Sequence, residues 1–534
     1  MAKIILRSSE ARSKILTGLN LVADTIAVTA GPLGRNIILQ QKNQLTPLIV
    51  NDGVTIAKDI NLVDPIENIG ASMIKQVAEA TNTDAGDGTT TAIILTQTII
   101  NQSFKLIEKG VDPIALKDAI QTLSNVAIEK LTQLSRPLTT NQEIVAVAKI
   151  ASNNPKIAKL IGKAYETVSN DGIIKIEDSQ TFNSHLEVGE GFEFNGGYLS
   201  RYMLDDLTKP EINWHHVKVL VFNEKLNSLK AIVKILEAAN QNKTPLVLIA
   251  QNFSDEIISL LAINKLKKIL NVIAIKPKNY FSNTNALLED LAIVINQKSY
   301  YSESQLNQLT WDDLAVVQQI KINQDKTTII HQLEDKTNFN HYLDQLKSQK
   351  DQYQLKDVEY NNLENRIAAL EAKIALIKIG GQTEIEQQEK KYRIEDALNA
   401  TAHAVKHGII PGAGMGLYYV AESLVKEYAD QANFQDGLAV ITDALKAPAQ
   451  QILKNASIDP YFLKQLYSPA NDQYFDVFNK SWNNAWEQLI IDPLVAAKTA
   501  LAKAISVATT LITTEAVIVE LIEKQRFVFP DIKS

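Results

Sequence analysis

The chain has 534 residues, more than one hydrophobic core normally supports, so several domains are expected. Its formal net charge is −7, with no large basic block and no cysteine, which argues against nucleic acid as the main partner and excludes disulfides and thiolate chemistry. The first residues lack the apolar stretch of a signal peptide, and no apolar run reaches the roughly 18 residues that span a bilayer. A soluble cytoplasmic protein without membrane contact is therefore expected.

The N-terminal part predicts a helix, a turn and a hairpin. The helix covers residues 8–30, because its aliphatic residues fall mostly on one stripe. It ends at Thr29-Ala30-Gly31-Pro32, where glycine and proline force a turn with exposed backbone groups. Apolar runs at 37–39 and 48–50 predict a hairpin. From its residues alone, Asn51-Asp52-Gly53 is a hairpin turn or a helix-entry turn.

The stretch Gly86-Asp87-Gly88-Thr89-Thr90-Thr91 begins a helical pattern at once. A helix N-terminus offers unpaired N–H groups and a partial positive charge to phosphate, and the two glycines let a ligand approach the backbone. Asp87 would repel phosphate unless a divalent cation such as Mg²⁺ lay between them. The alternative that Asp87 only caps the helix stays open at this point.

This hexapeptide resembles the phosphate- and magnesium-binding motif of chaperonins, and the chain is similar to GroEL-type (group I) chaperonins almost end to end. The resemblance implies an ATPase in which Asp87 holds Mg²⁺. It also implies that Thr29, Asn51 and Thr90 hold K⁺ and that Asp52 lies beside the γ-phosphate. The residues implied to contact the nucleotide in this half of the chain are Thr29, Ala30, Gly31, Pro32, Asn51, Asp87, Gly88, Thr89, Thr90 and Thr91.

Helices are predicted over residues 64–109, 113–134 and 141–168. Pro137 breaks this pattern and marks a plausible domain edge. An alternating strand at residues 173–177 follows the turn-forming residues Ser169-Asn170-Asp171-Gly172.

The middle of the chain predicts an α/β layer. Strand-like runs at 217–222, 245–250 and 272–275 alternate with helices at 227–240 and 255–270. From their residues alone, these helices are amphipathic helices packed on a sheet. The resemblance implies instead that they line a groove that captures unfolded polypeptides and later a co-chaperonin loop. The residues expected to form this exposed apolar surface are Tyr198, Tyr202, Met203, Val233, Leu236, Ala262 and Ile263.

Residues 341–377 predict a helical hairpin, with a coiled-coil dimer as the alternative. A strand at 374–379 and a helix at 384–407 follow. The helix carries Asp396, which is usually a solvated residue in such a position. The resemblance makes Asp396 the acid that acts on the attacking water, with Asp52 assisting.

The glycine-rich stretch 408–416 is neither a P-loop nor a dinucleotide fingerprint. The resemblance places its Gly412, Ala413 and Gly414 on the nucleotide. Helices at 417–428 and 435–455 follow, and an Ala-rich helix at 494–512 is expected to be buried. The residues implied to hold the nucleoside are Asp476, Val477 and Phe478 of a predicted strand and Asp492 of a turn.

Four features depart from the family. Ala372-Lys373 replaces a glycine pair at the upper hinge, and because both residues favour helix, a stiffer hinge is expected. Gly412-Ala413-Gly414 carries one methyl in a glycine triplet. Asn279-Tyr280-Phe281-Ser282 occupies the region of an apical Gly-Phe-Gly loop. No Gly-Met tail follows the final strand or tail at 527–530.

The predicted fold is multidomain α+β, as the resemblance implies. A helical equatorial ATPase domain comprises 1–133 and 407–534, a small intermediate hinge domain 134–190 and 374–406, and an α/β apical domain 191–373. Two stacked seven-membered rings, a GroES-type co-chaperonin and the cofactors ATP, Mg²⁺ and K⁺ are also implied. The predicted function is an ATP-driven folding chamber. A poorly cycling holdase and a surface-adhesion protein of the same fold are the alternatives, and a lidded group II chaperonin is disfavoured because no extra helical protrusion is evident.

Overall fold

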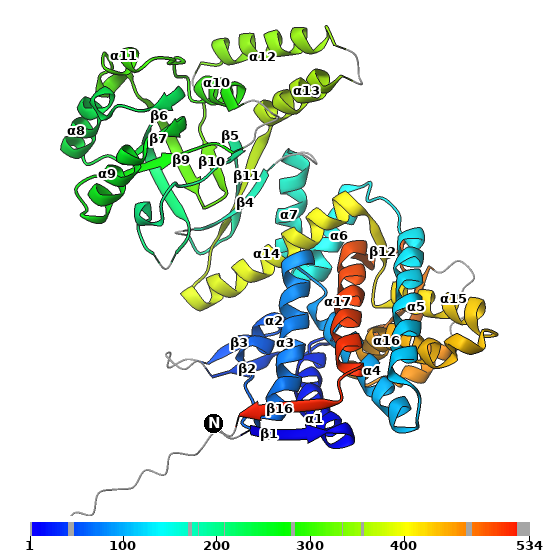
Figure 1. The fold of residues 1–534 in the computed structure, drawn as a ribbon. Helices are drawn as coiled ribbons and strands as arrows, with labels where there is room; N and C mark the ends of the chain where they lie inside the picture. The colour runs from blue at the N-terminus through cyan, green and yellow to red at the C-terminus, as the bar shows by residue number, and fades with distance from the viewer. Residues whose placement is uncertain are drawn as a thin grey trace, which may run out of the picture. The chain divides into compact units, whose positions relative to one another are not determined.

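The computed structural model describes residues 3–40, 47–168, 173–179, 181–207, 209–278, 284–333, 335–353, 357–465 and 472–520. The chain forms two compact units, one from Met1–Gly162 with Gly381–Ser534 and the other from Lys163–Gly380 (Figure 1). The boundary at Gly162 falls inside the first segment of the predicted intermediate domain, 134–190, and the boundary at Gly380 falls inside the second, 374–406. The division into three domains stays a prediction.

The first unit is mainly helical. Asp64 and Asp112 cap two of its helices, because each carboxylate accepts the first backbone N–H groups and a proline follows at the first helical position. Ile74, Phe104 and Leu501 are among the fully buried side chains of its main core. The helices of this core are α1 (Ser8–Ala27), α2 (Gly53–Asp59), α3 (Pro65–Ala85), α4 (Thr89–Glu108), α5 (Pro113–Leu134), α15 (Met415–Tyr428), α16 (Gln435–Asn455) and α17 (Leu494–Ile512).

The helix predicted at 494–512 is α17, with the same bounds. By length and composition alone it could cross a membrane, with a mean hydropathy of 1.4. It packs against α4 and α5, and its apolar side chains belong to the main core of the unit. Burial in this core accounts for its composition.

Left-handed residues interrupt two of the predicted helical stretches. The stretch 64–109 is divided between α3 and α4, where Gly86 has φ 63° and Gly88 has φ 85°. The stretch 141–168 consists of α6 (Asn141–Ser152) and α7 (Pro155–Val168), and Asn153 between them has φ 49°. Such residues end a helix by turning its backbone away from the axis.

Short antiparallel strand pairs complete the first unit. The predicted hairpin is confirmed, although its turn lies outside the described residues. The strand predicted at 474–478 ends at Asp476, because the carboxylate of Asp476 accepts hydrogen bonds from the N–H groups of Phe478 and Asn479 in a turn. The pairs are β1 (Lys3–Arg7) with β16 (Ala516–Glu520), β2 (Ile37–Leu39) with β3 (Leu48–Val50), β12 (Ile409–Pro411) with β15 (Ile491–Pro493), and β13 (Gln473–Asp476) with β14 (Ser481–Asn484).

The second unit contains an eight-stranded mixed sheet in the order β4-β11-β5-β10-β9-β6-β7-β8. The predicted strands at 217–222, 245–250 and 272–275 are confirmed as β6, β7 and β8, which pair in parallel as an α/β layer requires. The strands are β4 (Ile173–Asp178), β5 (His185–Asn195), β6 (Ile212–Leu226), β7 (Leu246–Phe253), β8 (Val272–Ile275), β9 (Ala315–Ile322), β10 (Lys326–Ile330) and β11 (Lys373–Ile379).

Helices cover this sheet. Figure 1 shows α8 and α9 on one side of it and α10 with the α12–α13 hairpin on the other. The predicted helical hairpin is confirmed, and Arg366 of α13 donates hydrogen bonds to Asp290 of α10 and to Tyr342 of α12. The helices are α8 (Val233–Asn242), α9 (Asp255–Leu266), α10 (Thr284–Val294), α11 (Glu303–Leu306), α12 (Thr337–Lys350) and α13 (Val358–Glu371).

The Ala372-Lys373 pair lies between a helix and a strand. Ala372 follows α13 with φ −61° and ψ 130°, and Lys373 begins β11. Neither residue extends the helix, so the reasoning that their helix propensity stiffens the hinge is wrong, although hinge stiffness itself stays a prediction. The predicted features at 169–172, 279–282 and 527–530 lie outside the described residues.

Candidate functional site

The N-terminus of α4 carries no side-chain cap. Gly88 is its N-cap residue and makes no side-chain cap hydrogen bond to the first N–H groups of the helix. Asp87 instead accepts from the N–H of Gly88, with 2.6 Å between Oδ1 and N. The alternative that Asp87 caps α4 is therefore wrong. The first N–H groups of this 20-residue helix are placed to bind an anion.

Two loops meet the start of α4. The Oγ1 atoms of Thr29 and Thr90 lie 3.4 Å apart. A Cβ added to Gly53 would lie 3.0 Å from the hydroxyl oxygen of Thr89 and 3.2 Å from that of Thr90. The turn at Asn51 therefore packs closely on the threonine hydroxyls, and a side chain at position 53 would crowd them. The structure thus brings together the three segments that the resemblance implies as K⁺ ligands.

The turn after α1 is held to α16. Asn455 donates hydrogen bonds to the carbonyl oxygens of Ala27 and Ala30, each at 2.9 Å. Gly31 has φ 80°, and a Cβ there would lie 3.0 Å from the side chain of Ile452. The backbone from Thr29 to Pro32 is therefore fixed beside the α4 terminus.

Asp52 caps α2. Its carboxylate accepts hydrogen bonds from the N–H of Val54 at 3.2 Å and from the N–H and hydroxyl of Thr55 at 2.8 and 2.7 Å. The helix-entry alternative for Asn51-Asp52-Gly53 is confirmed. These bonds fix the orientation of the carboxylate, which still acts electrostatically on its neighbours.

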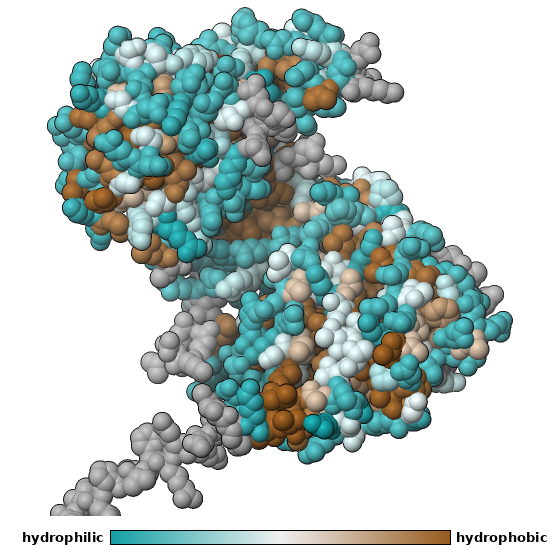
Figure 2. Space-filling model, viewed as in Figure 1, coloured by the Kyte–Doolittle hydropathy of each residue, from teal (hydrophilic) through white to brown (hydrophobic). Residues whose placement is uncertain are grey.

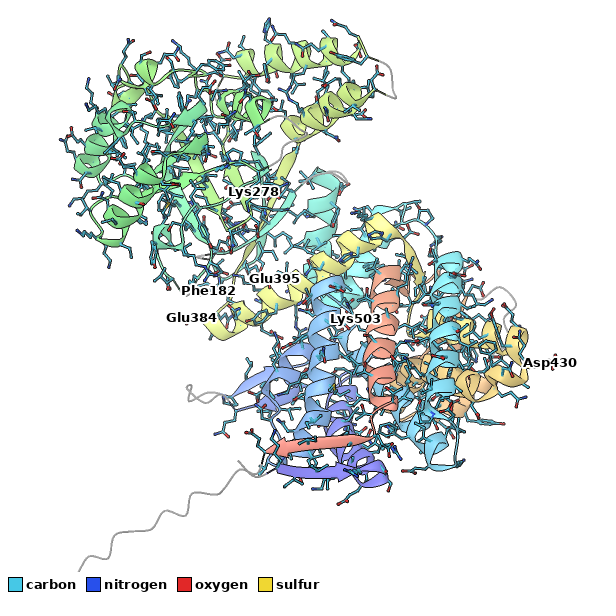
Figure 3. All side chains as sticks on the ribbon, viewed as in Figure 1. Phe182, Lys278, Glu384, Glu395, Asp430 and Lys503 are labelled. Carbon is cyan, nitrogen blue, oxygen red and sulfur yellow. The ribbon has the colours of Figure 1, made fainter. Side chains whose placement is uncertain are left out.

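Helix α14 (Glu384–His407) brings Asp396 to the same place. A Cβ added to Gly86 would lie 2.5 Å from the Cβ of Asn399, one turn after Asp396, so α14 lies directly against the glycine-threonine loop. Burial raises the pKa of Asp396 to about 8, and the charges of Asp52, Asp87 and Glu395 add to the effect. Figure 3 marks Glu395 on this helix. Asp396 is therefore close enough to Asp52 and Asp87 to interact with both.

Asp492 approaches from β15, where it pairs with Ile410 of β12. Burial raises the pKa of Asp492 to about 7, the charge of Asp87 adds to this, and a hydrogen bond from the N–H of Gly414 opposes it. The second glycine-rich loop lies beside it, because the N–H of Gly412 bonds to the carbonyl oxygen of Ile490 at 2.8 Å. The sequence-predicted Asp396 and Asp492 thus each lie within electrostatic range of Asp87.

The acidic cluster has no cationic partner among the described residues. Burial also raises the pKa of Asp87, and the charge of Asp52 contributes. Among the residues that the structure describes, no lysine or arginine acts on Asp87, Asp396 or Asp492, and no group of three potential ligands could hold a metal ion alone. Mg²⁺ needs no such group when phosphate oxygens and water complete its coordination. The donor set therefore fits a cation that arrives together with a phosphate ligand.

The predicted nucleoside residues form a turn that borders the second glycine-rich loop. Asp476 accepts hydrogen bonds from the N–H of Phe478 at 2.8 Å and from the side chain of Asn479 at 2.6 Å. Val477 is buried in one apolar cluster with Ala413 and Ile490, whereas Phe478 is exposed. Val477 and Ala413 thus belong to the same apolar cluster, and the ring of Phe478 is exposed to solvent.

The expected apolar surface of the second unit is only partly exposed. Tyr198, Met203, Leu236 and Ala262 are buried in the core of this unit, so the expectation that all seven residues form one exposed patch is wrong for these four. Their side chains belong to the same apolar core as buried residues of β6, β7 and β8.

Tyr202 and Ile263 are exposed by 56% and 51%, and Val233 is half-buried. Sequence reasoning missed Leu207, Leu266 and Ile269, which are also about half exposed or more. Leu266 lies three residues after Ile263 on α9, and this helical spacing could have identified it. Figure 2 shows apolar surface in the region of α9.

Comparison with known proteins places the chain in a family. The TCP-1/cpn60 chaperonin family matches residues 22–521. The chain is 39% identical over 543 residues to "Chaperonin GroEL" of Mycoplasma genitalium, covering 98% of this chain and 99% of that protein. It is 38% identical over 545 residues to "Chaperonin GroEL" of Mycoplasma pneumoniae, covering 99% and 100%.

The chaperonin gp146 of bacteriophage EL, crystallised in the presence of ATP-BeFx, shares the fold with a TM-score of 0.69 at 19% identity, covering 97% of this chain and 100% of that one. The predicted multidomain α+β chaperonin fold is thereby confirmed. With the family matched along most of the chain and GroEL proteins nearly 40% identical to it end to end, the chain belongs to the TCP-1/cpn60 chaperonin family as a group I, GroEL-type chaperonin, an ATPase that promotes protein folding.

Proposed function

We propose that the site at the N-terminus of α4 hydrolyses ATP with the help of Mg²⁺ and K⁺. The observation that carries this proposal is an uncapped helix terminus beside a cluster of carboxylates without a cationic partner among the described residues. Phosphate complements the N–H groups, and a metal ion complements the carboxylates. A metal–nucleotide complex supplies both at once, which neither an anion nor a cation does alone.

Asp87 is the residue that would hold Mg²⁺. When bound, the metal neutralises charge on the phosphates. The oxygens of Thr29, Asn51 and Thr90 would hold K⁺, since their segments meet within hydrogen-bonding range of the threonine hydroxyls. The residues proposed to contact the nucleotide are Thr29, Ala30, Gly31, Pro32, Asn51, Asp87, Gly88, Thr89, Thr90, Thr91, Gly412, Ala413, Gly414, Asp476, Val477, Phe478 and Asp492.

Asp396 would orient or deprotonate the attacking water, with Asp52 assisting. A pKa of about 8 keeps the carboxyl of Asp396 protonated at neutral pH in the unliganded protein. Positive charge near Asp87 would lower this pKa and ionise the acid. Asp396 thereby becomes able to accept a proton from water only when the cation is present. General-base catalysis of this kind contributes about 10²–10⁴ to the rate of hydrolysis.

Unfolded polypeptides would be captured in the second unit. The exposed side chains of Tyr202 and Ile263 and the half-buried Val233 support this, together with the exposed Leu207 and Leu266 beside them. A co-chaperonin of the GroES type, assembly into two stacked seven-membered rings and a cytoplasmic location complete the proposal, and they rest on membership of the GroEL group.

Steady-state ATPase measurements with and without a denatured protein test this function. The account expects hydrolysis that requires Mg²⁺, rises with K⁺ and changes when denatured protein is added. A protein that binds the denatured chain but hydrolyses no ATP would be a holdase, and the proposed ATP-driven chamber would be wrong.

A further inference from the structure

Arg136 makes three kinds of contact at one junction of the first unit. Its guanidinium lies 4.2 Å from the ring centroid of Trp486. The same group donates a hydrogen bond to Glu143 at 2.8 Å, and Glu143 is 5% exposed in its side chain. The backbone of Arg136 exchanges hydrogen bonds with Ile409, at 3.0 and 2.8 Å. One residue therefore connects α6, β12 and the turn before β15.

Each partner of Arg136 is itself fixed. Glu143 accepts the N–H groups of Thr139 and Thr140 at 2.9 and 3.0 Å, which anchors it at the start of α6. The backbone N–H of Trp486 donates to the side chain of Asn484 at 2.9 Å, and the ring of Trp486 packs against the apolar cluster of the junction. The guanidinium thus bridges an anchored carboxylate and a packed aromatic ring.

The junction joins the helix pair α6–α14 to the strand pair β12–β15. Its apolar cluster is small, and half of its buried members are alanines, in contrast to the large main core of the unit. Because so little apolar area is buried, polar and aromatic contacts at its rim carry a larger share of the docking. The cluster contains Ala146, Val147, Ala400, Ala404, Ile409 and Ile491, with Trp486 packed against it.

Both elements of the junction carry site residues. Asp396 lies on α14, one turn before Ala400, and Asp492 lies next to Ile491 on β15. On the same helix, Asn399 packs on Gly86 in the glycine-threonine loop, next to Asp87. A shift of α14 at this junction would therefore move Asp396 relative to Asp87.

We propose that Arg136 is a positioning residue for ATP hydrolysis, which fixes the α6–α14 pair on β12–β15 through Trp486 and Glu143 and thereby holds Asp396 at the site. The inference rests on the proposed role of Asp396. Arg136 does not touch the reacting groups, and it acts through the helix that carries the acid. Loss of its side chain leaves its backbone hydrogen bonds to Ile409 in place, so the chain path through the junction is unchanged.

Single-turnover ATP hydrolysis and calorimetric ATP binding, on full-length Arg136→Gln and Trp486→Leu, test this proposal. Hydrolysis is expected to fall about threefold to tenfold in each variant, as loss of one cation–aromatic contact predicts. ATP affinity should stay within about twofold, because the groups that hold the nucleotide are untouched. The double variant should hydrolyse ATP no more slowly than the slower single variant, since both substitutions remove the same contact between the guanidinium and the ring. Arg136→Lys, which keeps the charge beside Glu143, should recover part of the rate.

Lys446→Gln is the matched control. Lys446 lies 5.4 Å from the ring centroid of Tyr418 and pairs with Glu422 at 2.6 Å, the same kind of contact in the same unit but away from the junction. Its hydrolysis rate should equal that of the wild type. A wild-type rate in both junction variants, an equal loss of rate and affinity, or the same loss in Lys446→Gln would overturn the proposal. Asp396→Ala in the same assay separates the role of Arg136 from the role of Asp396. If Asp396→Ala is slow while Arg136→Gln is normal, only the inference about Arg136 fails. If Asp396→Ala is normal, the proposed role of Asp396 fails.

Discussion

Asp396→Asn should stabilise the unliganded protein as the pH rises. The pKa of Asp396 is raised to about 8, chiefly by burial and further by Asp52 and Asp87, against about 3.9 in an unfolded chain. Between these values the folded protein keeps a proton that the unfolded chain has released, so rising pH destabilises the wild type. For one proton, the free energy of unfolding of the wild type falls by at most about 1.4 kcal/mol per pH unit. Asparagine cannot ionise, so the advantage of the variant should start near zero at about pH 4, grow with this slope and level off above about pH 8.

Thermal unfolding of variant and wild type at pH 5, 6, 7 and 8, with EDTA and without nucleotide, measures this difference. Since a multidomain chaperonin does not unfold in two states, the test is the sign and trend of the difference in unfolding temperature. Asp430→Asn, which removes an exposed carboxylate marked at the periphery of the unit in Figure 3, controls for a general change in charge. A difference that stays constant with pH, or a variant less stable than the wild type at pH 8, would refute the reasoning.

Four further substitutions have distinct expected outcomes. Asp87→Lys should abolish Mg²⁺-dependent hydrolysis while rings still assemble, and normal turnover would remove Asp87 from the metal site. Ile263→Ser should weaken capture of denatured protein and leave stability unchanged. Leu236→Ser should lower the free energy of unfolding by about 2–5 kcal/mol, because Leu236 is only 6% exposed. Equal effects of the two substitutions on unfolding temperature and on capture would contradict the burial pattern. Ala413→Gly should stabilise the protein by up to about 1 kcal/mol, because Ala413 has φ 57°, a left-handed conformation that favours glycine. A lower unfolding temperature of the variant would show instead that the methyl group packs favourably.

Local sequence signals predicted the helices well. The bounds of α5, α14, α16 and α17 match the predicted ranges, because Asp112-Pro113 and Thr383 mark helix starts in the sequence itself. The same signals did not reveal that Ala372 ends α13, since the following strand pairing overrides helix propensity there.

The candidate site depended on the family resemblance. No periodicity relates Asp87, Asp396 and Asp492, which lie on separate elements and meet only through tertiary packing. For α8 and α9 the residues alone indicated amphipathic helices packed on a sheet, and the burial of Leu236 and Ala262 in the core agrees with this. The expectation that these two side chains are exposed came from the resemblance. The contact between Arg136 and Trp486 joins distant parts of the chain and left no local signal.

The measurement that tests the central claim most directly is single-turnover ATP hydrolysis by Asp396→Ala, alongside ATP binding by calorimetry. The account predicts near-normal ATP affinity and hydrolysis at least about a hundredfold slower than in the wild type. Hydrolysis at the wild-type rate would show that Asp396 does not act on the attacking water, and failure to bind ATP would show that Asp396 maintains the structure of the site instead.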